Sequence, residues 1–282
     1  MVTEPEDWQP PVPTGRSFAP IEGFPSWMRQ PLILWLQMRF PSNREWVITD
    51  HLVNFQIEMQ RDFGFVPGET RWNEVSRWLL EISDAEFLLF LDFLLWKSSQ
   101  ERSPAHINAH VVEDILSRSG SRWSAVRVGK RVRLTERVSQ GVAGSVAQAL
   151  TGSDASARKL QEAWVDAFGI KVRPSVAYYN AVVAVENAAF AIVPLEGEPT
   201  LSSLFSVLHA DTPKWRLILR DSDNAPGAKV LEKMLRALWR GHDSRHGASD
   251  YEDVTLEQAR AAVMLAATLV WWFQNGVVIP VS

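Results

Sequence analysis

One short segment concentrates side chains that could act on a phosphate: Arg240-Gly-His-Asp-Ser-Arg-His-Gly247. Its two arginines and two histidines follow a predicted helix that ends near Trp239. A helix C-terminus favours cations, but a simple helix cap would use only one of the four groups. Guanidinium binds phosphate oxygens as a fork, and imidazole transfers protons near neutral pH. The pattern therefore favours chemistry on a phosphodiester, with His246 moving a proton and Arg240 or Arg245 binding the phosphate.

Glu186 is the only charged residue of a second predicted helix, over Ser175–Val193. The side chains around it are mostly valine and alanine, and an unpaired carboxylate is costly to bury among them. We therefore expect Glu186 to meet a cation, with Arg240, Arg245 or His246 as the candidates. The alternative is that Glu186 reaches an exposed stripe of its helix.

A β-hairpin is predicted around Gly129, because valines alternate with arginines on both sides of it. A two-residue turn would pair Val128 with Arg131 and mix the two faces. A three-residue loop over Gly129–Arg131 instead places the four apolar residues on one face, namely Val126, Val128, Val132 and Leu134. We therefore predict the three-residue loop.

The hairpin also lies in a strongly basic segment, since Arg118–Arg137 contains seven basic residues and one acid, Glu136. Such a cluster can track the phosphates of a nucleic acid. The candidate RNA-binding residues are Arg127, Lys130, Arg131 and Arg133. The alternative is an ordinary solvated face.

Composition narrows the possible chemistry. The 282 residues carry a net charge of −4, which excludes a globally basic nucleic-acid coat, and contain no cysteine, which excludes thiolate nucleophiles and cysteine metal sites. A spacing of His106, His110 and Glu113 could place three metal ligands on one helical face, with a polar helix face as the alternative. We expect no metal and no other cofactor.

The same sequence argues against a membrane protein. The uninterrupted apolar stretch Ala261–Phe273 is shorter than the roughly 20 residues needed to span a bilayer. The N-terminus lacks a basic region followed by an apolar one, so no secretory signal is expected. We expect a cytoplasmic protein.

The elements that must position these residues are mainly helices. We expect a proline-rich tail (residues 1–30), an N-terminal helical region (31–117), the basic hairpin with its linker (118–150) and a C-terminal helical domain (151–282). Apolar spacing and capping residues predict nine helices: Leu32–Phe40, Arg44–Phe63, Thr70–Ile82, Ala85–Lys97, Asp154–Phe168, Ser175–Val193, Thr200–His209, Pro226–Trp239 and Thr255–Phe273. Their tryptophans and phenylalanines are expected to form the core.

Together, several features of residues 175–276 resemble the HEPN superfamily. They are an apolar helix with one acid, a helix that ends in arginine, a polar loop with His-Gly, and a final helix of the form A-R-A-A-V-M-L-A-A-T-L-V-W-W-F. Within that superfamily the segment is most similar to the C-terminal domain of abortive-infection proteins.

The resemblance implies a four-helix domain that pairs with a second copy, so that two R-x₄₋₆-H motifs meet and cut RNA without metal. Arg240 and His246 match the motif, and Glu186 matches the acid of the preceding helix. Gly241 departs from the polar residue usual after the arginine, which leaves Arg245 as the alternative cation.

The resulting expectation is a metal-independent endoribonuclease toxin of an abortive-infection, antiphage defence system. Its expected partners are RNA, a second copy of the chain and a regulatory protein. The alternative is a non-catalytic HEPN-like module that binds or senses RNA or a protein through the same loop.

Overall fold

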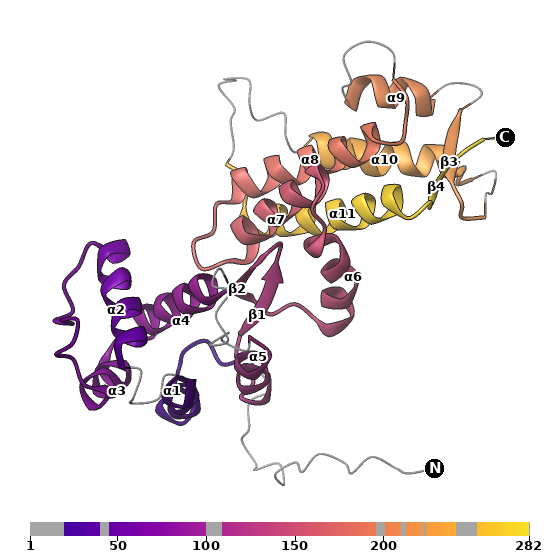
Figure 1. Cartoon of the computed structure of the whole chain (residues 1–282). Coiled ribbons are helices and arrows are strands. Elements are labelled where there is room, and N and C mark those ends of the chain that lie inside the picture. Colours follow the sequence, from indigo (N-terminus) through magenta and orange to yellow (C-terminus); the bar gives the residue numbers. More distant parts are fainter. Residues whose placement is uncertain are drawn as a thin grey trace, which may run out of the picture.

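A computed structural model describes residues 20–39, 45–99, 109–195, 201–209, 213–220, 222, 224–240 and 253–281. The protein is mainly α-helical, as predicted, with eleven helices and two small antiparallel sheets in this part of the chain (Figure 1). None of these helices is long and apolar enough to cross a membrane. The elements are α1 (Ser26–Arg39), α2 (Glu45–Met59), α3 (Trp72–Glu81), α4 (Asp84–Ser98), α5 (Ala109–Arg118), β1 (Trp123–Val128), β2 (Arg131–Glu136), α6 (Gln140–Thr151), α7 (Ala155–Phe168), α8 (Pro174–Phe190), α9 (Leu201–His209), β3 (Trp215–Leu217), α10 (Gly227–Arg240), α11 (Leu256–Gln274) and β4 (Val278–Pro280).

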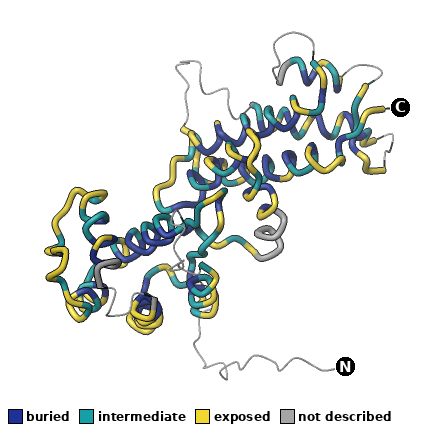
Figure 2. The backbone as a smooth tube through the Cα atoms, viewed as in Figure 1, coloured by how far each residue is buried: buried dark blue, intermediate teal, exposed yellow. Residues whose placement is uncertain are grey.

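Helices α1–α5 surround the first of two hydrophobic cores. Aromatic rings dominate it: Phe55, Trp78 and Phe90 lie with ring centroids 5.2–6.4 Å apart in edge-on arrangements. Aromatic pairs in this geometry add to the energy of burial. The prediction that the aromatic residues of this region form a core is therefore confirmed, and Figure 2 shows the buried stretch along α4.

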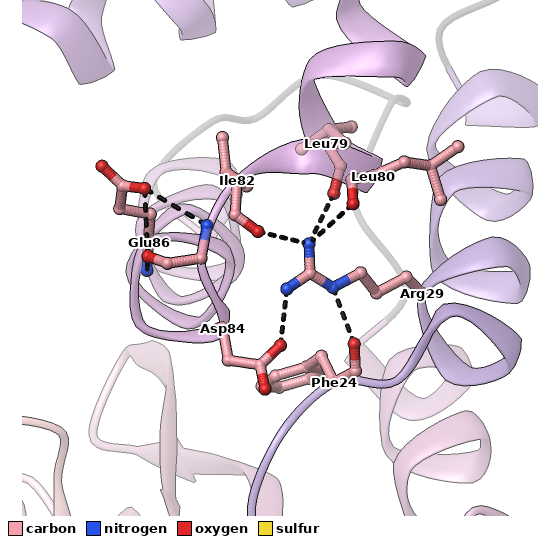
Figure 3. A network of polar contacts seen from close by, with 8 residues as sticks. Phe24, Arg29, Leu79, Leu80, Ile82, Asp84 and Glu86 are labelled. Atoms are coloured by element: carbon pink, nitrogen blue, oxygen red, sulfur yellow. Dashed lines mark hydrogen bonds and ion pairs between the residues drawn. The ribbon is translucent and has the colours of Figure 1, made fainter.

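Arg29 on α1 holds α3 and α4 together (Figure 3). Its side chain is buried, and it donates hydrogen bonds to the carbonyls of Phe24, Leu79 and Ile82 at 2.7–3.0 Å and to the Asp84 carboxylate at 2.5 Å. The α3 carbonyls at a helix C-terminus lack partners within the helix. Arg29 satisfies them and so fixes three helices with one side chain.

Helices α6–α11 surround the second core. Arg260, near the start of α11, donates to the carbonyl of Ala167 at the end of α7, while Gln274, at the end of α11, donates to Ser156 at the start of α7. Helices α7 and α11 are therefore antiparallel. The β3–β4 pairing joins the segment before α10 to the segment after α11, so α10 is antiparallel to α11.

The hairpin has a different turn from the one predicted. Val128 lies opposite Arg131, and Val126 lies opposite Arg133, so the turn contains only Gly129 and Lys130. Gly129 has φ +61°, as expected for the first central residue of a tight hairpin turn. An added Cβ at Gly129 would also lie 2.6 Å from the Gln161 side-chain oxygen. The prediction of a three-residue loop was therefore wrong.

The two-residue turn places apolar and charged residues together on each face of the hairpin, which was the argument against it. In the structure, each face packs against helices. One face directs Val128 into the core of α6–α11, and the other directs Leu134 into the core of α1–α5. The three-residue prediction assumed that a hairpin has one buried face. Here each face is partly buried, and the hairpin lies between the two helical groups (Figure 1).

All nine predicted helices are present, with shifted ends. Helix α1 begins at Ser26 rather than Leu32 and contains Pro31, whose ring removes a bond to the carbonyl of the exposed Trp27. Thr255 and Gln258 form a capping box at the start of α11. Two helices were not predicted, α5 and α6, the second lying in the expected linker.

Asp92 on α4 fastens the hairpin to the first helical group. Its carboxylate accepts from the Leu134 amide at 2.7 Å and from the Arg133 guanidinium at 3.0–3.2 Å. The Asp92 side chain is only 12% exposed. Removing one partner of a buried pair leaves the other uncompensated.

We therefore expect Asp92→Ala to lower the free energy of unfolding by about 2–4 kcal/mol. Urea denaturation followed by circular dichroism measures it. Asp114→Ala is the control, because Asp114 and Arg118 form an exposed pair within α5, and exposed pairs contribute about 0–1 kcal/mol. Equal effects of the two substitutions would contradict the proposed role of Asp92.

Candidate functional site

Of the predicted catalytic residues, His246 and Arg245 lie outside the described residues. Arg240 is the last residue of α10, and its backbone is helical, as predicted for a cation at a helix C-terminus. The position of its side chain is also outside the described part. The structure thus places the start of the R…H segment but not the arrangement of its side chains.

Glu186 is half-buried on α8 and is not an isolated charge. The same helix holds the end of α10, because the Tyr178 hydroxyl donates to the Leu238 carbonyl at 2.8 Å. Glu186 follows Tyr178 by eight residues, about 12 Å along the helix axis. The helix with the predicted acid and the helix end with Arg240 are therefore neighbours, and contact of Glu186 with a motif cation stays a prediction.

Part of the basic segment is neutralised by acids, two of which come from distant parts of the sequence. Arg133 pairs with Asp92, and Arg137 pairs with Glu113 at 2.6 Å. Arg122 lies 2.9 Å from Glu136, an ion pair within the hairpin region. A local count of charge cannot detect the partners contributed by α4 and α5.

Three of the four predicted RNA-binding residues form no ion pair within the described residues: Arg127, Lys130 and Arg131. Arg127 and Lys130 are exposed at the hairpin tip, and Arg127 donates to the carbonyl of Gly129 at 3.2 Å. The Arg131 guanidinium lies 5.6 Å from the centre of the Trp96 ring. Arg133, the fourth, is engaged by Asp92, so the phosphate-binding prediction rests mainly on the other three.

A pocket of about 460 Å³ lies where the hairpin, the end of α4 and the bundle helices α7 and α8 meet. Its lining includes four arginines, two acids and an aromatic ring: Arg131, Arg133, Arg158, Arg173, Glu162, Asp166 and Trp96. Ligand pockets of this size bind small molecules. No signal in the sequence predicted it, because its walls come from segments up to about eighty positions apart.

We call this pocket the arginine pocket. Helix α7 supplies one of its walls, and the residues of that wall form a single stripe. Its residues recur at three- and four-residue spacing on one side of the helix: Arg158, Gln161, Glu162, Val165 and Asp166. Gln161 also donates to the carbonyls of Leu150 and Gly152 at 2.8 Å each, and Gly129 donates to the same Leu150 carbonyl at 2.9 Å. These bonds fix the hairpin tip against α7.

The possible metal ligands considered in the sequence are not assembled into a site in the described part of the chain. Glu113 accepts from the Ala125 amide and the Ser124 hydroxyl and pairs with Arg137. It therefore anchors β1 to α5. His110 is exposed, and His106 lies outside the described residues.

Glu136, at the end of β2, connects the hairpin to the bundle. Its carboxylate accepts from Arg260 on α11 at 2.5 Å and from Arg122 at 2.9 Å. Burial by itself raises the pKa of Glu136, but the hydrogen bonds and charges of Arg260 and Arg122 outweigh this and lower the pKa. The lowered pKa makes the stability contributed by this junction depend on pH.

Comparison of the chain with family models, curated proteins and solved structures finds no significant match. The HEPN resemblance therefore rests on the residues that carry it.

We expect Glu136 to contribute stability at neutral pH that is lost in acid. Because its pKa is lowered in the folded state, this contribution is present above the unfolded value of about 4.3 and disappears as the pH falls through the folded value. Glu136→Gln should lower the free energy of unfolding by about 1–2 kcal/mol at pH 7 and by less at pH 3. Urea titrations at both pH values test this, with the exposed Glu81→Gln as control. A deficit that is the same at pH 3 and pH 7 would contradict it.

Proposed function

We propose that the protein is a HEPN-like endoribonuclease that cuts RNA without a metal ion and acts in the cytoplasm as the toxin of an abortive-infection, antiphage defence system. The observation that supports this proposal is the common core of the three helices on which the resemblance rests. Helix α8 carries Glu186, α10 ends at Arg240, and α11 is the apolar terminal helix. All three contribute buried residues to the core of α6–α11.

The chemistry follows from the residue types of the R…H segment. His246 removes the proton of the ribose 2′-hydroxyl or protonates the departing 5′ oxygen. Arg240 binds the phosphate oxygens and stabilises the charge that grows on them in the transition state. Glu186 orients the cation. Arg245 is the alternative for the arginine role because Gly241 interrupts the family pattern.

The proposed protein works as a homodimer, because one R…H segment supplies half of the paired site that the resemblance implies. The regular apolar seam along α11 is already buried within the chain. Ala259, Val263, Ala266, Val270 and Phe273 are all buried against the other helices of the same bundle. A dimer interface therefore has to use another surface of the bundle. We also propose that a regulatory protein restrains the toxin.

We expect the purified protein to cleave single-stranded RNA in the presence of EDTA and to leave cyclic-phosphate ends. His246→Ala should reduce the rate by about 10²–10⁴-fold, the usual effect of removing a proton-transfer group. Gel analysis of end-labelled RNA measures the rate. Comparing Arg240→Ala with Arg245→Ala identifies the catalytic arginine, and we expect Arg240→Ala to be the more damaging.

The matched control is His110→Ala, which removes an exposed histidine on α5 without touching the bundle. Circular dichroism establishes that each variant is folded. Undiminished cleavage by His246→Ala would overturn the nuclease proposal. RNA binding without cleavage by the wild type would also overturn it and favour the non-catalytic binding module, which the cationic lining of the arginine pocket supports.

A further inference from the structure

Two cations that line the arginine pocket form no ion pair in the described part of the chain. Arg131 on β2 lies over the Trp96 ring, and Arg158 on α7 donates only to the carbonyl of Ser153, at 2.8 Å. The other two arginines of the lining already have carboxylate partners. The two unmatched guanidinium groups come from different walls of the pocket, so a ligand with more than one anionic group can bind both.

The rest of the lining favours an acidic peptide over a nucleic acid strand. Glu162 lies on the α7 stripe, and its side chain is 52% exposed. A carboxylate at this position repels a chain of phosphates, whereas it can accept hydrogen bonds from the N–H groups of a peptide. Trp96, Val128 and Val165 add apolar surface to the walls, against which an aromatic side chain can pack. The pocket therefore fits a peptide that combines carboxylates with an aromatic residue.

The chain itself contains a segment of this composition, Glu4-Pro-Glu-Asp-Trp8. It belongs to residues 1–19, which lie outside the described residues. The first fifteen residues contain three acids and neither lysine nor arginine. The described chain begins beside the base of the hairpin, where the Ile21 amide donates to the carbonyl of Gly120 at 2.9 Å and the Ile21 carbonyl accepts from the Arg122 amide at 2.8 Å. The acidic segment is thus attached next to the strand that leads to the pocket.

The chain between Trp8 and Pro20 is long enough for the segment to reach the pocket. An extended chain spans up to about 3.3–3.6 Å per residue, which gives about 40 Å for this interval. Ser121 and Val128 are joined by β1, along which their separation is about 23 Å. Tethering over such a length also keeps the local concentration of the segment at about millimolar, so a weak contact is sufficient.

We propose that residues 4–8 dock in the arginine pocket of the same chain. Their carboxylates bind Arg131 and Arg158, and Trp8 packs against the apolar wall that includes Trp96. The docked segment neutralises the two unmatched cations and joins the N-terminus to α7. This contact involves neither the R…H segment nor Glu186, so it does not depend on ribonuclease activity.

A photo-crosslink in the full-length chain tests this docking. Because the chain has no cysteine, Gln9→Cys can be labelled with benzophenone maleimide directly after the acidic segment. After irradiation, mass spectrometry should locate the main crosslink on α7 or β2. Arg131→Gln/Arg158→Gln should reduce its yield by at least about tenfold, since the segment loses both charge-assisted contacts.

The matched control is Arg127→Gln/Lys130→Gln, which removes two exposed charges from the hairpin tip but none from the pocket lining. It should change the crosslink yield by less than about twofold. Circular dichroism establishes that both double variants are folded.

A second pair of variants changes the segment and leaves the described residues of the pocket intact. Glu6→Gln/Asp7→Asn should reduce the crosslink yield by at least about fivefold, because the carboxylates that bind the arginines are removed. Glu69→Gln/Glu81→Gln removes two exposed acids elsewhere and should leave the yield unchanged. A salt concentration of about 1 M should lower the yield of the unmodified sequence, because it screens exposed charges beyond about 3 Å.

Crosslinks spread over other elements would overturn the docking, as would a yield that the pocket variant and the tip control reduce equally. A crosslink that joins two chains, visible as a dimer on a denaturing gel, would assign the segment to a second copy and overturn docking within one chain. Loss of the crosslink on addition of equimolar single-stranded RNA would make the pocket a nucleic-acid site and would also overturn it. Because the readout is a crosslink, absence of ribonuclease activity leaves this result intact.

Discussion

The rest of the structure depends on a hairpin that carries apolar residues on both of its faces. Its tight turn at Gly129 and Lys130 sends Val128 toward the bundle of α6–α11 and Leu134 toward the helices α1–α5. A hairpin of two strands has little stability alone. Here each strand face is covered by a different helical group, so the two groups and the hairpin stabilise one another. The arginine pocket exists only because this arrangement brings β2 beside α7.

Polar contacts then fix the position that the apolar faces set. Asp92 secures β2 to α4, Glu113 secures β1 to α5, and Glu136 secures the far end of β2 to α11. Each of these acids binds at least one arginine of the basic segment. Three of the seven basic residues in this segment thus have a structural role. Of the unmatched charges near the tip, Arg131 lines the pocket.

The helices could be predicted from the sequence because their apolar spacing is local. The end of α10 at Arg240 and the capping box of α11 followed from residues a few positions apart. The turn of the hairpin could not be predicted, because the burial of its second face depends on Leu134 meeting helices far earlier in the chain. Helix α6 was missed for a similar reason: its glycine-rich start favours a loop, while Val146, Ala149 and Leu150 are buried by the bundle.

The candidate functional residues also differ in whether the sequence alone reveals them. The R…H segment and Glu186 are visible in the sequence because unusual residue types stand close together or alone. The pocket is invisible there, since Trp96, Arg131, Arg158 and Asp166 come from three separate elements. Long-range pairs such as Arg133 with Asp92 also change the meaning of a local basic cluster. The sequence predicts chemistry near one helix end, whereas tertiary packing creates a pocket that no local pattern predicts.

The most direct test of this account is disulfide trapping of the hairpin register, which the absence of native cysteine makes unambiguous. In the two-residue turn Arg127 lies opposite Val132, so Arg127→Cys/Val132→Cys should oxidise readily to an intramolecular disulfide. A three-residue loop would place Arg127 opposite Arg133 instead. Mass spectrometry of tryptic peptides after mild oxidation detects either link. Efficient closure of Arg127→Cys/Val132→Cys, with little closure of Arg127→Cys/Arg133→Cys, is the predicted result, and the reverse would contradict the two-faced hairpin.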